Sequence, residues 1–176
     1  MHSLELLLDD ATDAAVRAHW RRLLDADLPS QARHTGASNR PHVTLALADD
    51  LPVDVVAAVR RAVGASLPLD LRLGGLLVFA GRRPVVSRLV VASTALLDLQ
   101  AAVVAALGDE AVDPHGQFAA GAWTPHVTLA RRLGPDDLGA VLEVAGEEPV
   151  DLVGRAVELR QWDMTAKVTG TLVAAQ

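Results

Sequence analysis

The chain has 176 residues, of which 51% are hydrophobic and 22% charged, and its formal net charge at pH 7 is −6. This length and apolar content suit one domain with a substantial core and exclude a disordered chain. The absence of cysteine excludes disulfides, thiolate metal sites and a cysteine nucleophile. The acidic balance disfavours sequence-independent binding to long duplex nucleic acid, which needs a broad basic face.

The N-terminal segment lacks the basic region and apolar stretch of a signal peptide, and no apolar run approaches the ~18 residues of a membrane span. We therefore expect a cytoplasmic, monomeric protein with no membrane partner.

Hydrophobic periodicity in the first half predicts four strands and two helices, of which the first helix is amphipathic and the second is shorter. In chain order they are strand 3–8, helix 10–27, strand 42–48, helix 52–65, and strands 69–73 and 75–80. Two glycines between the last two strands mark a turn or bulge. The periodicity of the first helix favours an inner face made of Ala14, Ala15, Ala18, Leu23 and Leu24.

The second half repeats this order. It predicts strand 85–92, helix 94–107, strand 126–131, a helix from 136 or 137 to about 144, and strands 150–162 and 167–174. Because the halves match, we expect one α+β domain over residues 1–176, made of two pseudo-symmetric lobes, about 1–82 and about 83–176. Each lobe would contain an antiparallel sheet with helices packed on it, and an active cleft would lie between the lobes.

A six-residue sequence, PHVTLA, occurs twice, beginning at Pro41 and at Pro125. Six consecutive matches have a chance expectation of roughly 1% in a chain of this composition. The repeat keeps histidine and threonine, which are scarce in this sequence, so coincidence between two buried strands is a poor explanation. We therefore interpret the two copies as matching parts of one functional site.

Side chains alternate faces along a strand, so His42 and Thr44 share one face, and His126 and Thr128 share the corresponding face in the second copy. Two imidazoles across a small volume are suited to general acid–base catalysis near neutral pH. The two hydroxyls can donate hydrogen bonds to the oxygens of a phosphoryl group. This chemistry requires no metal and no cofactor, and either histidine could be the base.

The paired motifs read HVTL at 42–45 and HVTLAR at 126–131, and GLLVFAGRRPVV precedes the midpoint. Together they resemble the 2H phosphoesterase superfamily, and within it the bacterial 2′-5′ RNA ligase or LigT-like branch of RNA 2′,3′-cyclic phosphodiesterases. The resemblance implies a two-lobed α+β fold whose motifs face each other across a cleft. It makes His42 and His126 the acid–base pair and Thr44 and Thr128 phosphate binders.

Five further residues are candidates for substrate binding. The resemblance implies that Arg131 contacts the phosphate or its neighbour and that Phe79 contacts a base. Strand alternation instead favours Arg132, which has the same parity as the motif histidine. Arg40 flanks the first motif, and Trp123, just before the second, could stack on a base.

The predicted function is hydrolysis of a 2′,3′-cyclic phosphate, at an RNA end or on a small nucleotide, to a 2′-phosphate. Run in reverse, the same site would perform 2′-5′ RNA ligation. One alternative is a different phosphodiester, such as a 2′-5′ oligonucleotide or an ADP-ribose cyclic phosphate. Another is a non-catalytic nucleotide-binding module, which the intact histidine and threonine pairs disfavour.

Overall fold

The structure is a computed structural model that describes residues 1–119, 121–147 and 151–175. The strands are β1 (His2–Leu8), β2 (His42–Ala48), β3 (Leu69–Phe79), β4 (Val85–Val90), β5 (Ala111–Val112), β6 (His126–Ala130), β7 (Leu152–Asp163) and β8 (Val168–Ala174). The helices are α1 (Asp10–Asp25), α2 (Val53–Val63), α3 (Thr94–Leu107) and α4 (Asp137–Gly146), with short 3₁₀ turns η1 (Gln31–Arg33) and η2 (Gly108–Glu110). The predicted α+β class is confirmed.

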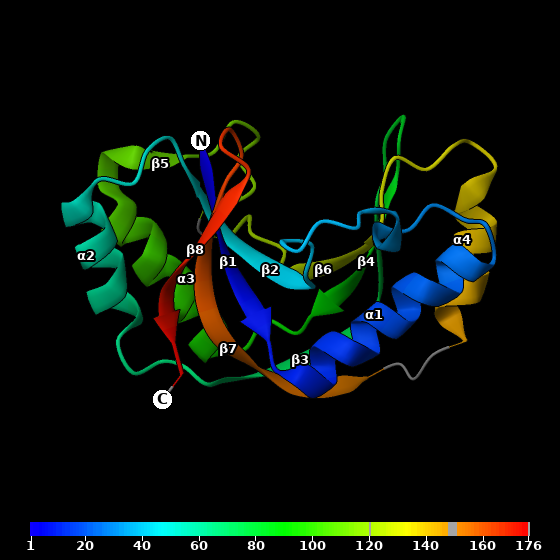
Figure 1. Ribbon diagram of the computed structural model, residues 1–176, viewed down its shortest axis with the longest axis horizontal. Helices are drawn as coiled ribbons and strands as arrows, with labels where there is room; N and C mark the ends of the chain where they lie inside the picture. The colour runs from blue at the N-terminus through cyan, green and yellow to red at the C-terminus, as the bar shows by residue number, and fades with distance from the viewer. Residues whose placement is uncertain (120, 148–150, 176) are drawn as a thin grey trace.

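The strands form one antiparallel sheet in the order β5-β2-β1-β7-β3-β4-β6, with β8 paired to β7 (Figure 1). The long strand β7 makes this continuity possible. It pairs with β1 along one edge, and along the other edge it pairs first with β3 and then with β8. As a result β2 and β6, which carry the repeated motifs, lie far apart in the strand order.

The helices form two pairs that flank the sheet (Figure 1): α2 packs against α3, and α1 packs against α4. Each pair joins a helix from before the sequence midpoint with one from after it. The division of the chain near residue 82 stays a prediction, but the packing shows that segments from both halves build each side of the molecule. None of the helices in the described part of the chain is long and apolar enough to span a bilayer.

The expected strands 69–73 and 75–80 form a single strand, β3. Its pairing with β4 shifts register between Leu73 and Leu76, where two glycines lie side by side in the sequence. A bulge therefore replaces the turn, because glycine accommodates the local distortion and pairing with β4 resumes beyond it.

Helix α1 buries a different face from the one its apolar residues predict. Ala14 and Leu24 are exposed, and the buried set is Thr12, Asp13, Val16, His19, Trp20 and Leu23. One cause is the close approach of α1 to β7, where a Cβ added at Gly154 would lie 1.7 Å from Thr12 Oγ1. The missing side chain on β7 lets a polar residue of α1 sit against the sheet.

Candidate active site

Both repeated motifs open onto one cleft. β2 and β6 contact each other although they lie at distant places in the strand order (Figure 1). Their first residues, His42 and His126, line a common cavity of about 740 Å³, together with Thr44, Phe79 and Trp123. The fold thus brings together both predicted histidines and four of the other predicted site residues, since Arg131 also lines this cavity.

The two histidine rings are held in the same way. His42 Nδ1 lies 2.7 Å from the Arg40 carbonyl oxygen, and His126 Nδ1 lies 2.8 Å from the Thr124 carbonyl oxygen. A carbonyl can only accept, so each Nδ1 donates and carries a proton. In the neutral ring, Nε2 is then the acceptor that remains for chemistry. A proline stands between each histidine and the carbonyl that holds it, and its fixed φ keeps this turn the same in both motifs.

The two histidines nevertheless have unequal surroundings. Burial lowers the pKa of His126 below its ordinary value, and the neighbouring imidazole of His42 lowers it further, whereas the hydrogen bond to Thr124 acts in the opposite direction. Phe79 contributes to this burial, because its ring centroid lies 4.6 Å from that of His126 at an interplanar angle of 60°. His126 is therefore neutral at pH 7.

Alternation within the motif strands holds as predicted. Val43, Leu45, Val127 and Leu129 are fully buried, whereas the histidines and threonines are partly exposed. Thr44 lines the main cavity, and Thr128 lines an adjoining cavity of about 100 Å³.

A bulge changes the alternation further along β2. Glu5 of β1 pairs with Thr44, but the preceding Leu4 pairs with Ala46, so Leu45 is the extra residue. Beyond it the faces exchange, and Leu47 lines the cavity while Ala46 is buried.

Two tryptophans link the motif strands reciprocally. Trp20, which precedes the first motif in sequence, donates its indole N–H to the carbonyl oxygen of Thr128 in the second motif at 3.0 Å. Trp123, which precedes the second motif, donates to the carbonyl oxygen of Thr44 in the first at 3.1 Å. Trp123 thus anchors β2 and lines the cavity at the same time.

The structure separates the two candidate arginines at the end of the second motif. Strand β6 ends at Ala130, and Arg132 takes a left-handed φ of 60°, so strand alternation no longer applies there. Arg131 lines the main cavity, whereas Arg132 lines only a neighbouring cavity. The sequence argument that favoured Arg132 is therefore wrong about which of the two faces the cleft.

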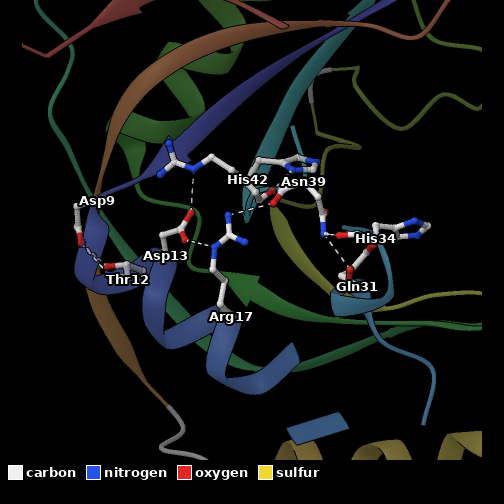
Figure 2. Close-up of polar contacts among 9 residues, drawn as sticks. Asp9, Thr12, Asp13, Arg17, Gln31, His34, Asn39 and His42 are labelled. Carbon is white, nitrogen blue, oxygen red and sulfur yellow. Dashed lines mark hydrogen bonds and ion pairs between the residues drawn. The ribbon is translucent and has the colours of Figure 1, made fainter. Parts of the chain in front are cut away.

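Arg40 makes contacts with helix α1 that the sequence did not suggest; Figure 2 labels Asp13 and Arg17, the helix residues of this network. Arg40 Nε donates to Asp13 of α1 at 3.2 Å, and Arg17 Nε donates to the other oxygen of the same carboxylate. Because the Arg40 carbonyl holds His42, this network ties the ring of His42 to helix α1. Arg40 also lines the smaller cavity, so its substrate contact stays a prediction.

Sequence reasoning missed a buried ion pair on the floor of the cleft. Arg160 of β7 donates Nε to Glu5 Oε2 at 2.9 Å, and Ser3 donates its hydroxyl to Glu5 Oε1 at 2.6 Å. The same Oε1 lies 3.7 Å from His42 Nε2 and forms an ion pair when His42 is protonated. The available signal was the two polar residues that interrupt the otherwise apolar strand β1.

Within the described ranges, no group of three or more His, Asp or Glu side chains is placed to hold a metal ion. The histidines and carboxylates that line the main cavity are His42, His126 and the paired Glu5.

Comparisons with known proteins bear on the fold and the family of the chain. The chain is similar in fold to Usb1 from Kluyveromyces marxianus, with a TM-score of 0.56 and 14% sequence identity over 97% of this chain and 96% of that one. The comparison with curated proteins returned no match. A family model described as the 2′-5′ RNA ligase superfamily matches residues 9–166, which include both motifs. On that match the chain belongs to the 2′-5′ RNA ligase superfamily.

Proposed function

We propose that this phosphoesterase-type enzyme hydrolyses 2′,3′-cyclic phosphates, at an RNA end or on a nucleotide, and leaves a 2′-phosphate. The observation that carries the proposal is the matched pair of imidazoles, His42 and His126, each fixed through Nδ1 and lining one cavity. Fixed orientation leaves Nε2 of each ring for proton transfer, the arrangement that a paired acid and base require.

The unequal surroundings support one division of roles. His126, whose pKa burial lowers, is the base, because it is neutral at pH 7. His42, with the Glu5 carboxylate 3.7 Å from its Nε2, is the acid, because a nearby negative charge attracts the protonated ring. In the step, Nε2 of His126 takes a proton from water as the water oxygen bonds to phosphorus. The bond from phosphorus to O3′ breaks, and His42 Nε2 gives its proton to O3′.

Other cleft residues suit the remaining parts of the substrate. The hydroxyls of Thr44 and Thr128 and the guanidinium of Arg131 can bind the non-bridging phosphate oxygens, which carry the developing charge. Phe79 and Trp123, which both line the main cavity, offer aromatic surface for a nucleobase.

Two alternative substrates and the reverse reaction remain proposals within this scheme. The same geometry would act on a 2′-5′ linkage or on an ADP-ribose cyclic phosphate, and in reverse it would join a cyclic phosphate to a 5′-hydroxyl. Membership of the bacterial LigT-like branch also stays a prediction. A purely binding module is disfavoured, because it has no need for two imidazoles that are held in the same way and line one cavity.

The test is incubation of the purified protein with adenosine 2′,3′-cyclic phosphate, followed by ³¹P NMR. We expect adenosine 2′-phosphate as the product, at an unchanged rate in excess EDTA, because the histidines perform both proton transfers. The double variant His42→Ala/His126→Ala controls for contaminating nucleases. Formation of the 3′-phosphate, dependence on an added divalent ion, or equal turnover by the double variant would each contradict the proposal.

A further inference from the structure

A second cavity, of about 490 Å³, opens from the catalytic cleft beside His42. Four residues line both spaces: Glu5, His42, Arg131 and Trp162. The two cavities are therefore continuous around the proposed acid, and a substrate held between the histidines could extend from one into the other.

The two sides of His42 differ in chemistry. The catalytic cavity combines polar residues and Lys167 with a set of aromatic and apolar side chains, among them Phe79, Phe118, Trp123 and Met164. The second cavity is lined by cationic and polar side chains, among them Arg33, His34, Ser38, Asn39, Arg131 and Arg160. An apolar side suits a nucleobase, and a side rich in arginine suits an anionic group.

The positive charge on this side stands out in a chain whose net charge is −6. The carboxylate that lines the second cavity, Glu5, is already bonded to Arg160 and Ser3. A third cavity, of about 400 Å³, continues past Arg33 and Arg131 to Arg132. Its two carboxylates are bonded as well, one to Arg33 and the other to a backbone N–H. Arginines thus outnumber carboxylates in both cavities along the path that leads away from His42, although Arg160 and Arg33 are each paired with one carboxylate.

The segment that forms the rim is held in place before any ligand binds (Figure 2). Asn39 donates its amide to the carbonyl oxygens of Gln31 at 2.9 Å and His34 at 2.7 Å, which closes the loop 31–39 on itself. Arg17 of α1 donates Nη2 to the Asn39 carbonyl oxygen at 3.0 Å. The rim therefore needs little ordering when it binds a ligand, which favours affinity.

We infer that the loop 33–39, together with Arg131, which lines both cavities and can contact both phosphates, forms a second phosphate subsite. This subsite binds the phosphate on O5′ of the nucleoside whose cyclic phosphate lies between the histidines. The inference rests on the proposed function. In a 2′,3′-cyclic phosphate the ring occupies O2′ and O3′, so O5′ is the ribose oxygen left to carry another phosphate. The substrate class is thus a nucleotide that bears a 5′ phosphoryl group, either as a terminal monoester or as the diester link to a preceding nucleotide.

The experiment compares kcat/KM for three probes at low salt: adenosine 2′,3′-cyclic phosphate, its 5′-phosphorylated form, and a dinucleotide ending in the same cyclic phosphate. We expect the wild type to prefer both phosphorylated probes by about 10-fold, the scale of a hydrogen bond to a charged group. A preference for only one of them identifies the terminal or the diester source. Added salt should reduce the preference, because it screens the charges.

The variant Arg33→Ala/His34→Ala removes two rim groups that take no part in the proposed proton transfers. It should abolish most of the preference and leave turnover of the unphosphorylated probe within about 2-fold of wild type, which also shows that the variant is folded. Arg61→Ala on α2, an exposed arginine on the other helix pair, is the matched charge control and should retain the preference.

Two results would overturn the inference while leaving the proposed function intact: equal kcat/KM for all three probes in the wild type, or a preference that survives in the rim variant. Turnover of none of the three probes by the wild type would instead contradict the proposed function itself.

Discussion

His126 and His42 have the same sequence context and the same Nδ1 hydrogen bond, yet the surrounding residues differ. His126 packs against Phe79, and burial lowers its pKa. His42 instead has Glu5 within 3.7 Å. Neighbours on other strands thus give two chemically identical groups different surroundings, and burial lowers the pKa of His126.

The variant Phe79→Ala tests this dependence. A base acts only when neutral, so kcat/KM falls as pH falls through the pKa of His126, which burial holds below 6.5. Removal of the aromatic ring exposes the imidazole to water and raises that pKa toward 6.5. We expect the acidic limb of the pH–rate profile to move to higher pH. Val78→Ala, the exposed neighbour on β3, should leave it in place, and an unmoved limb in Phe79→Ala would contradict this account.

At the residue scale, the sequence predicted the side chains that the repeat duplicates. His42, Thr44 and His126 line the cleft because strand alternation is a local property. Glu5 and Arg160 were not predicted, because their pairing joins strands β1 and β7, which are distant in the sequence. A charged residue that interrupts an apolar strand indicates a buried partner but does not identify it.

At the scale of elements, the cleft depends on the relative position of β2 and β6, which are not paired with each other in the sheet. Trp20 and Trp123 each precede one motif and hold the threonine carbonyl of the other. This reciprocal pairing couples helix α1 to β6 and the loop before β6 to β2. It fixes the relative position of the motif strands through side chains, not through ladder hydrogen bonds.

The variants Trp20→Phe and Trp123→Phe each remove one indole donor and keep most of the aromatic volume. Each should lower the free energy of unfolding by about 1 kcal/mol, the usual net worth of a hydrogen bond. Each should also lower kcat by about 5-fold, since small displacements of catalytic groups slow reaction. Denaturant unfolding and steady-state kinetics measure both effects. Loss of stability with unchanged kcat would show that the tryptophans support the fold without positioning the motifs.

The element-scale predictions failed where tertiary packing overrides local pattern. Helix α1 buries Thr12 and Asp13 in place of Ala14. Thr12 packs against Gly154 of β7, and Asp13 accepts a hydrogen bond from Arg40. The side chain of Arg131 reaches the cleft because β6 ends one residue earlier, and strand ends are poorly specified by sequence.

At the scale of the whole molecule, the sequence predicted the order of strands and helices along the chain. It did not predict which helices pair, and the division into two lobes stays a prediction. The two halves do repeat strands and helices, but α1 packs with α4 and α2 with α3, so each side of the cleft contains segments from both halves. Hydrophobic periodicity identifies the face of a helix or strand that is buried. Which other element packs on that face depends on long-range strand pairing, here through β7.

The interleaved packing has a consequence for the site. Because β2 and β6 belong to opposite ends of one continuous sheet, the distance between His42 and His126 depends on the whole strand path and on both helix pairs. The geometry of the two histidines thus depends on the complete domain, and the proposed mechanism requires both of them for turnover.

The measurement that tests this most directly is kcat/KM of His42→Ala, His126→Ala and the double variant on a 2′,3′-cyclic nucleotide that the wild type hydrolyses. Each single variant should lose about 10²–10⁴-fold, the range for a general acid or base. The double variant should lose less than the product of the two losses, because the residues act as a unit. If either single variant retains near-normal turnover of every cyclic phosphate that the wild type hydrolyses, the two-histidine mechanism is wrong.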